Sequence, residues 1–403
     1  MSFSLDAFFR HSGTRFRVYA QSPVLADFST PEIIAVSSPA GTVGPGPSDP
    51  RMYAVIPQEK APYGASDLPP FRGRTRPPAR PGPGGHFDHL SEDDPAFAAA
   101  HMFAIVRRVL DVWEIYAGGP IQWHFCATHR RLEMIPDVPW DNAHFGWGFM
   151  ECGHGKDDQG LERAFALNFD VLAHETGHGI AYALLGVPTA ETLTTAYRGF
   201  HEAVSDCVAM LSALHFDSFV DHVLRVSAGQ LYLANELNRI GELSKTRQIR
   251  SASNALTMAD VISLDTPPGE VKGKEAHTLS LPMTGAIFDI LIALFVRRLV
   301  HFGTITPAMA RDLDRAVAGA DETQMAGGPI VEAYAREPAR FRDALRDARD
   351  MVGLRLLETL RRMKADGLSY KAVAHTFMAV DRQFTGDLNS ETIAECFKWR
   401  EII

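Results

Sequence analysis

Residues 170–178 read Asp-Val-Leu-Ala-His-Glu-Thr-Gly-His, inside a segment, 167–186, whose apolar spacing predicts a helix. Positions four residues apart share one face of a helix, so His174 and His178 can bring two imidazole nitrogens to one metal ion. Glu175 projects beside them, toward a water molecule at the metal. The pattern is typical of zinc hydrolases, and it predicts where the chemistry of this chain takes place.

A second helix, expected over 199–215, carries Glu202 and Asp206 one turn apart. Glu202 can supply a carboxylate as third metal ligand, and Asp206 can accept the other N–H of a ligand histidine and so fix its tautomer. Two histidines, one glutamate and an open fourth position predict a catalytic zinc site rather than a structural one. The alternative for the two acids is a solvated helix face.

These residues resemble the zinc region of the thermolysin-like metalloendopeptidases, the gluzincins, whose third ligand is a glutamate. Residues 142–153, Asn-Ala-His-Phe-Gly-Trp-Gly-Phe-Met-Glu-Cys-Gly, are similar to that family's edge strand. There the Asn142 side chain and the Ala143 carbonyl are expected to hold an extended peptide. The resemblance covers about residues 91–300. It implies one catalytic Zn²⁺, a peptide or protein substrate, and support of the ligands by Asp206 and Asp170.

Two downstream segments extend the resemblance. Arg250, in Ile-Arg-Ser-Ala-Ser at 249–253, is similar to an arginine that binds a substrate carbonyl. His277, in His-Thr-Leu-Ser at 277–280, is similar to a histidine that donates to the oxyanion. Val171 and Ile249 map in part onto the hydrophobic specificity pocket, with core packing as the alternative.

The resemblance is incomplete in three places. The interval from His178 to Glu202 is longer than the family's usual one. Ala213 stands where an acidic calcium ligand is expected, so the sequence does not favour structural Ca²⁺ although Asp170 is present. The residues from His277 through Gly285 are expected to form a loop longer than the family's.

The implied reaction is hydrolysis of internal peptide bonds, with Glu175 as general base and His277 helping to hold the oxyanion. A zinc aminopeptidase is one alternative, because 148–152, Gly-Phe-Met-Glu-Cys, resembles the Gly-x-Met-Glu-Asn strand of that class, although the Asn is absent. The other alternative is a non-catalytic zinc scaffold that binds peptides or a partner protein through the same cleft.

The composition sets wider limits. The chain has 403 residues, 46% hydrophobic and 22% charged, which excludes a disordered or collagen-like protein. A net charge of −9 does not favour a nucleic-acid partner.

The longest apolar run, 286–296, contains Asp289 and is too short to span a membrane. The N-terminus lacks a continuous apolar stretch and the 4 cysteines are widely spaced, so we expect a cytoplasmic protein. The sequence does not indicate an oligomeric state.

The predicted fold class is α+β: a thermolysin-like zincin with a mixed N-terminal sheet lobe, an all-α C-terminal lobe and a small irregular, β-rich N-terminal appendage. The predicted boundaries are 1–63 for the appendage, 64–90 for a Pro/Gly-rich linker, 91–186 for the α+β lobe with the zinc helix, and 187–403 for the mainly helical lobe with the third ligand. Strands are expected at 15–20, 32–36, 52–56, 121–127 and 145–152, and further helices from Phe97 to Gly118 and at 283–301.

Residues 381–392 have the glycine and spacing of a calcium loop. Gln383, Thr385 and Thr392 replace its usual acidic ligands, which predicts a plain connection between two helices.

Overall fold

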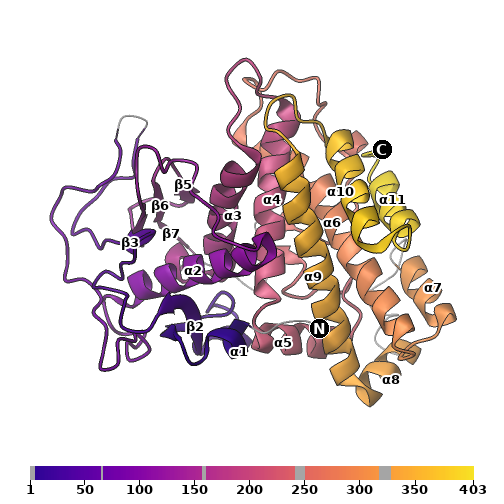
Figure 1. Ribbon diagram of the computed structural model, residues 1–403, viewed down its shortest axis with the longest axis horizontal. Coiled ribbons are helices and arrows are strands. Elements are labelled where there is room, and N and C mark those ends of the chain that lie inside the picture. The colour runs from indigo at the N-terminus through magenta and orange to yellow at the C-terminus, as the bar shows by residue number, and fades with distance from the viewer. Residues whose placement is uncertain (1–4, 65–66, 157–159, 241–249, 317–327) are drawn as a thin grey trace. The chain divides into compact units, whose positions relative to one another are not determined.

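The computed structural model describes residues 5–64, 67–156, 160–240, 250–316 and 328–403. Its internal contacts divide the chain into two compact units. The described part of Phe3–Ala183 forms the N-terminal unit, and Leu184–Ile240 with Arg250–Ile403 forms the helical unit. The sheets lie mostly in the first unit and the long C-terminal helices in the second, so the fold is α+β, as the sequence predicts (Figure 1).

A four-stranded sheet is the frame of the N-terminal unit. Its order is β3 (Met52–Ala54), β4 (Leu132–Ile135), β6 (Phe149–Cys152) and β5 (Ala143–Phe145). The first three strands are parallel, and β5 is an antiparallel edge strand. The single strand predicted at 145–152 is therefore wrong. The chain reverses between β5 and β6 at Gly148, whose φ of 88° favours glycine.

Helix α2 (Phe97–Ala117) packs on that sheet on one side and on the antiparallel pair β1 (Gly13–Val18) and β2 (Glu32–Pro39) on the other (Figure 1). It ends at Gly118, as predicted, in a left-handed cap with φ 68°. Strands β1 and β2 pack on α2, and β3 joins the sheet, so these parts of the segment predicted as an appendage, 1–63, pack within this unit.

Two buried carboxylates bind the Pro/Gly-rich chain to the sheet. Glu151 of β6 accepts hydrogen bonds from Lys60 Nζ (2.7 Å) and the Tyr63 backbone N–H (2.6 Å). Glu133 of β4 accepts from the Tyr63 hydroxyl (2.6 Å) and the Phe71 backbone N–H (2.8 Å). Both glutamates are 0% exposed. Part of the predicted linker 64–90 is therefore held on the sheet.

The strand predicted at 121–127 is also wrong, because these residues form turns. The Trp123 indole donates to the Arg51 carbonyl (3.2 Å) and stacks on Phe125 with ring centroids 5.6 Å apart. Aromatic packing, rather than strand pairing, therefore accounts for this apolar run. The remaining elements of the unit are α1 (Leu5–Phe9), η1 (Ala26–Phe28), β7 (His154–Lys156) paired with β8 (Glu162–Ala164), η2 (Phe165–Leu167) and α3 (Phe169–Leu185).

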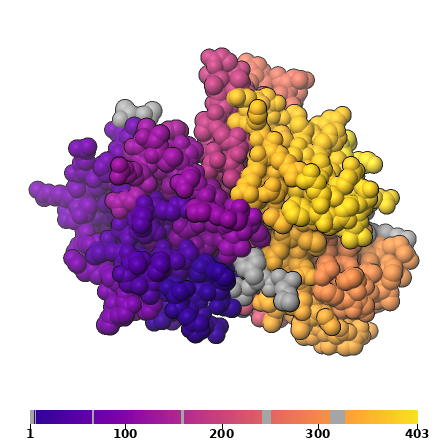
Figure 2. All heavy atoms as spheres, in the orientation of Figure 1, coloured from indigo at the N-terminus to yellow at the C-terminus, as the bar shows by residue number. Residues whose placement is uncertain are grey.

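The helical unit is organised around α6 (Gly273–His301), which packs against α4, α9 and α11. The other elements are α4 (Thr195–Ala213), α5 (Asp217–Ser227), β9 (Arg239–Ile240), β10 (Arg250–Ser251), η3 (Met258–Asp260), α7 (Pro307–Ala316), α8 (Pro329–Arg336), α9 (Pro338–Arg362), α10 (Tyr370–Thr385) and α11 (Ser390–Trp399). On the face shown in Figure 2, the yellow C-terminal helices form much of the surface of this unit.

Helix α6 meets a length and composition test for a membrane span, and so do α4 and α5 if they are taken together across their 93° bend. The apolar window of α6 is 89% buried inside the protein. The core helix of a folded domain meets the same test, and the burial accounts for the hydropathy of α6.

Helix α6 begins ten residues before the predicted start at 283, so the loop expected from His277 through Gly285 is helical instead. Pro282 lies inside the helix, where it lacks a backbone donor. Side chains from other elements contact this turn: the Tyr370 hydroxyl donates to the Leu279 carbonyl (2.8 Å) and Asn254 Nδ2 to the Leu281 carbonyl (3.2 Å). Tertiary hydrogen bonds thus support the helix at the proline.

The plain connection predicted at 381–392 is confirmed. Helix α10 ends at Thr385 and α11 begins at Ser390. Asp381 is 0% exposed and accepts hydrogen bonds from Arg355 Nε and from Asn389 Nδ2, the latter at 3.2 Å. The carboxylate therefore joins helices rather than facing an open loop.

Candidate metal centre

Helix α3 brings together His174, Glu175 and His178. One ligand atom from each lies within 4.8 Å of the others, and the two imidazole rings are 4.7 Å apart at an angle of 86°. His174 is 6% and Glu175 7% exposed. Two imidazole nitrogens and a carboxylate are donors that zinc accepts. The i, i+4 spacing has produced the cluster that the sequence predicts.

The edge strand β5 packs directly on this helix. A Cβ added to Gly179 would lie 2.6 Å from Phe145 Cζ and 2.9 Å from Trp123 Cζ3. Contacts that short do not occur with a real Cβ, so a glycine is needed one residue after His178. The strand and the two histidines are therefore held next to each other within the N-terminal unit.

The outer side of β5 presents backbone groups. The Gly153 N–H donates to the Asn142 carbonyl, and the Gly146 N–H to the Phe149 carbonyl, both at 2.8 Å. Hydrogen-bonded and non-bonded pairs alternate along antiparallel strands, so the N–H and C=O groups of Ala143 and Phe145 point away from β6. This is the edge-strand geometry expected for Asn142-Ala143; the substrate role of these residues stays a prediction.

The end of β6 lies close to Glu175. Burial, followed by the charges of Glu175 and Glu151, raises the pKa of the Cys152 thiol well above its usual value. Cys152 is 0% exposed and stands opposite Ala143 in the strand pair. Nothing in the sequence pattern connects this cysteine with the cluster.

A set of aromatic side chains beside the cluster was not identified from the sequence pattern. The His124 ring lies 4.7 Å from Tyr182, 5.0 Å from Trp147 and 6.1 Å from Phe145, measured between centroids. Burial lowers the pKa of His124 to about 4, so it is neutral at pH 7. The available signal was the position of Tyr182, four residues after His178 and on the same helix face.

In the helical unit, Glu202 and His277 form a pair. His277 Nε2 lies 3.2 Å from Glu202 Oε2, where the His277 side chain is 45% exposed and that of Glu202 16%. Glu202 is on α4, and His277 is in the second turn of α6. The sequence identifies these residues separately, as a ligand and as an oxyanion donor; the fold brings them within hydrogen-bond distance.

The remaining predicted residues lie in several places. Asp170 is in the first turn of α3, where the helix dipole favours a negative charge, and it accepts a hydrogen bond from Gln21 Nε2 (3.0 Å). Asp206 is 0% and Val171 8% exposed. Arg250 begins β10, but its side chain, like the whole of Ile249, lies outside the described residues.

No known family profile matches the sequence, and no curated protein matches it. The fold is similar to that of a solved structure, the precursor of protealysin, a metalloproteinase from Serratia proteamaculans. The similarity has a TM-score of 0.51, covers 88% of this chain and 89% of that chain, and includes 14% sequence identity. At that identity the likeness is one of fold. The chain thus has a fold similar to that of a metalloproteinase precursor and carries a His-Glu-His cluster on one helix.

Proposed function

We propose that the protein is a zinc-dependent metalloendopeptidase that hydrolyses internal peptide bonds. The observation that carries the proposal is the His174, Glu175 and His178 cluster on α3, whose ligand atoms lie within 4.8 Å of one another. The neighbouring edge strand supports it, because the outward backbone groups of Ala143 suit an extended peptide.

His174 and His178 would hold the metal, with Glu202 as third ligand and Asp170 and Asp206 supporting the set. Two nitrogens and one carboxylate suit a zinc site that keeps one position open. When bound, zinc supplies a Lewis acid that polarises the scissile carbonyl and lowers the pKa of water.

The residues of the chain carry out the proton transfers and hold the substrate. Glu175 accepts the proton of the attacking water and passes it to the leaving amine. His277 donates a hydrogen bond to the developing oxyanion. His277 Nε2 lies 3.2 Å from Glu202 Oε2, so the proposed oxyanion donor is next to the proposed third ligand. Asn142, Ala143 and Arg250 hold the peptide backbone.

The test is metal content by elemental analysis combined with hydrolysis of a library of blocked internal peptides, with and without a zinc chelator. The wild type and Glu175→Gln are compared. One zinc per chain and cleavage that is lost with chelator and in Glu175→Gln support the proposal. Full activity of Glu175→Gln contradicts the role of Glu175 as base.

Two other outcomes lead to the alternatives. Preference for peptides with a free N-terminus over blocked internal ones indicates a zinc aminopeptidase. One bound zinc with no cleavage of any peptide in the library indicates a scaffold that binds peptides or a partner protein.

A further inference from the structure

A cavity of about 780 Å³ lies in the helical unit, between α6, α7 and α11. Its volume is typical of small-molecule sites. One wall follows α6 from Asp289 to His301, about 18 Å of helix. Among the residues that the structure describes, all that line it belong to the helical unit, and none is assigned to the proposed metal centre.

Part of the cavity wall is apolar. Val296, Val300 and Ala310 line it, and Val296 is only 6% exposed. Trp399 of α11 also lines it and remains 51% exposed. A ligand with an apolar body would cover this indole and release the water on it.

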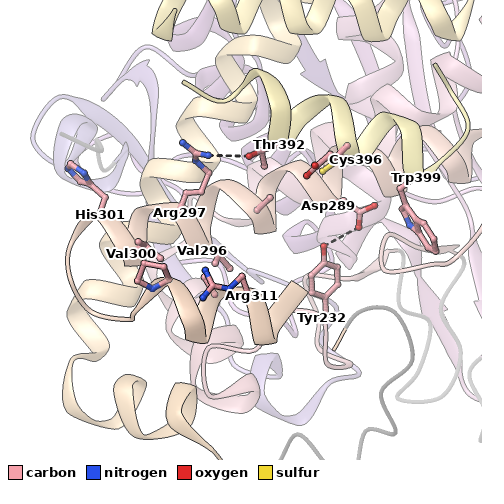
Figure 3. A pocket seen from close by; sticks show the side chains of 14 residues that line it. Tyr232, Asp289, Val296, Arg297, Val300, His301, Arg311, Thr392, Cys396 and Trp399 are labelled. Carbon is pink, nitrogen blue, oxygen red and sulfur yellow. Dashed lines mark hydrogen bonds between the residues drawn. The ribbon is translucent and has the colours of Figure 1, made fainter. Parts of the chain in front are cut away.

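One end of the cavity is basic. Figure 3 shows Arg297 and His301 toward one end, and Asp289, Tyr232 and Trp399 toward the other. Arg297 is held in place because it donates to Thr392 Oγ1 (3.2 Å) and to the Leu388 carbonyl (2.8 Å).

Arg311 of α7 adds a second guanidinium between these ends (Figure 3). It is exposed and forms no ion pair with any residue in the described ranges. Within the described part of the lining, Glu395 is the one exposed acid, and Arg297 and Arg311 outnumber it.

The buried acid at the other end is already paired. Asp289 is 6% exposed. Its Oδ2 accepts a hydrogen bond from Arg400 Nε (2.9 Å) and lies 2.8 Å from Arg400 Nη2. Its Oδ1 accepts one from the Tyr232 hydroxyl at 3.3 Å. Arg400 therefore offsets the charge of Asp289, and the cavity as a whole favours an anion.

We propose that this cavity binds an amphipathic organic monocarboxylate of the fatty-acid type. Its carboxylate contacts Arg311 and Arg297, and its alkyl chain lies along Val296 toward Trp399. The combination of apolar side chains in the wall, the two guanidinium groups of Arg297 and Arg311, and a neutralised acid matches a ligand with one anionic group and one apolar body.

The first experiment measures binding of octanoate, decanoate and dodecanoate to the full chain by calorimetry, below their micelle concentrations. Each added methylene should strengthen binding by about fourfold until the cavity is filled. Dodecanol and dodecylammonium should bind at least about tenfold more weakly than dodecanoate, because they lack the carboxylate.

Variants locate the site. Arg311→Gln should weaken dodecanoate binding by about tenfold or more, whereas Lys398→Gln, an equal charge change on an exposed residue outside the lining, should have little effect. Ala310→Phe should fill the cavity and abolish binding, with thermal unfolding showing that this variant is folded.

A second readout uses the thiols. Cys396 lines the cavity, whereas Cys126 is exposed in the N-terminal unit. Dodecanoate at ten times its dissociation constant should slow alkylation of Cys396 by about elevenfold and leave that of Cys126 unchanged. Absence of binding, equal binding of dodecanol, wild-type affinity in Arg311→Gln, or no protection of Cys396 would each overturn the proposal.

Discussion

Gly179 of α3 lies against the ring of Phe145 of β5, so closely that a Cβ at position 179 would be 2.6 Å from Phe145 Cζ. The helix with the two histidines of the cluster and the strand with the outward backbone groups are therefore in contact through a residue that has no side chain. The relative position of helix and strand depends on this contact.

Gly179→Ala should destabilise the N-terminal unit by about 1–3 kcal/mol, because the added methyl group overlaps two aromatic rings. Urea unfolding would measure this. Gly119→Ala is the matched control, since a Cβ there meets nothing within 4 Å. In a double-mutant cycle, Phe145→Leu should recover part of the loss; additive effects would show that the two residues do not interact.

Glu175→Gln should keep its zinc and lose activity by a factor of about 10²–10⁴, which is the usual contribution of a general base. The substitution retains the size of the side chain and removes the group that accepts the proton. Elemental analysis and peptide hydrolysis measure the two effects separately. Loss of zinc together with activity would mean that Glu175 is a metal ligand rather than the general base.

Substitutions of Glu202 and His277 should impair different properties, zinc binding and kcat respectively, although the two side chains are only 3.2 Å apart. Glu202→Gln should weaken zinc binding, which competition with a chelator would measure. The loss of affinity should exceed about 10–100-fold, the usual effect of removing a residue that only hydrogen-bonds to a ligand. His277→Ala should leave zinc in place and lower kcat by about 10²–10³. Unchanged kcat in His277→Ala would argue against its role as oxyanion donor.

His101 should make the N-terminal unit sensitive to acid. Burial lowers its pKa to about 4, despite the hydrogen bond between its Nδ1 and the Ala166 carbonyl. Between pH 6.5 and 4 the unfolded chain binds a proton at this histidine and the native state does not. The free energy of unfolding is therefore highest above pH 6.5 and decreases as the pH falls. The loss is about 3 kcal/mol over that range.

His101→Gln, which keeps a donor for the Ala166 carbonyl, should show a smaller fall in unfolding free energy between pH 6.5 and 4.5 than the wild type. Urea titrations at several pH values would measure both slopes. Equal slopes would mean that His101 is protonated in the folded protein.

Lys60→Met should destabilise the protein by about 3–5 kcal/mol, because it leaves the buried Glu151 without its charge partner. Burial alone would raise the pKa of Glu151, but hydrogen bonds from His144, Lys60 and the Tyr63 backbone outweigh it and lower this pKa. Lys364→Met, on an exposed residue, is the control. A loss no larger than that of the control would show that the Lys60 contact is dispensable.

The cluster on α3 could be predicted because its geometry is local. Helical spacing alone sets the distance between His174 and His178, and apolar periodicity gave the helix itself. The end of α2 was predictable for the same reason, since Gly118 supplies a left-handed cap.

What could not be predicted depends on partners far along the chain. Strand β4 pairs in parallel with β3, from which it is separated by some eighty residues, and no local pattern records that pairing. The family resemblance implied a loop from His277 through Gly285, but this segment is helical, and hydrogen bonds from Tyr370 and Asn254 support the helix there. The contact between Glu202 and His277 likewise depends on how α4 packs against α6.

The attachment of the Pro/Gly-rich chain to Glu133 and Glu151 limits how this protein can be trimmed or recombined. Removing the residues before 91 would remove β3, expose β4 as a new sheet edge, and take away the donors that Lys60, Tyr63 and Phe71 supply to Glu151 and Glu133. We therefore expect proteolytic removal of β3, Lys60, Tyr63 and Phe71 to destabilise the N-terminal unit. The described residues ahead of α2 therefore belong to one folding unit with most of the helix that carries the histidines.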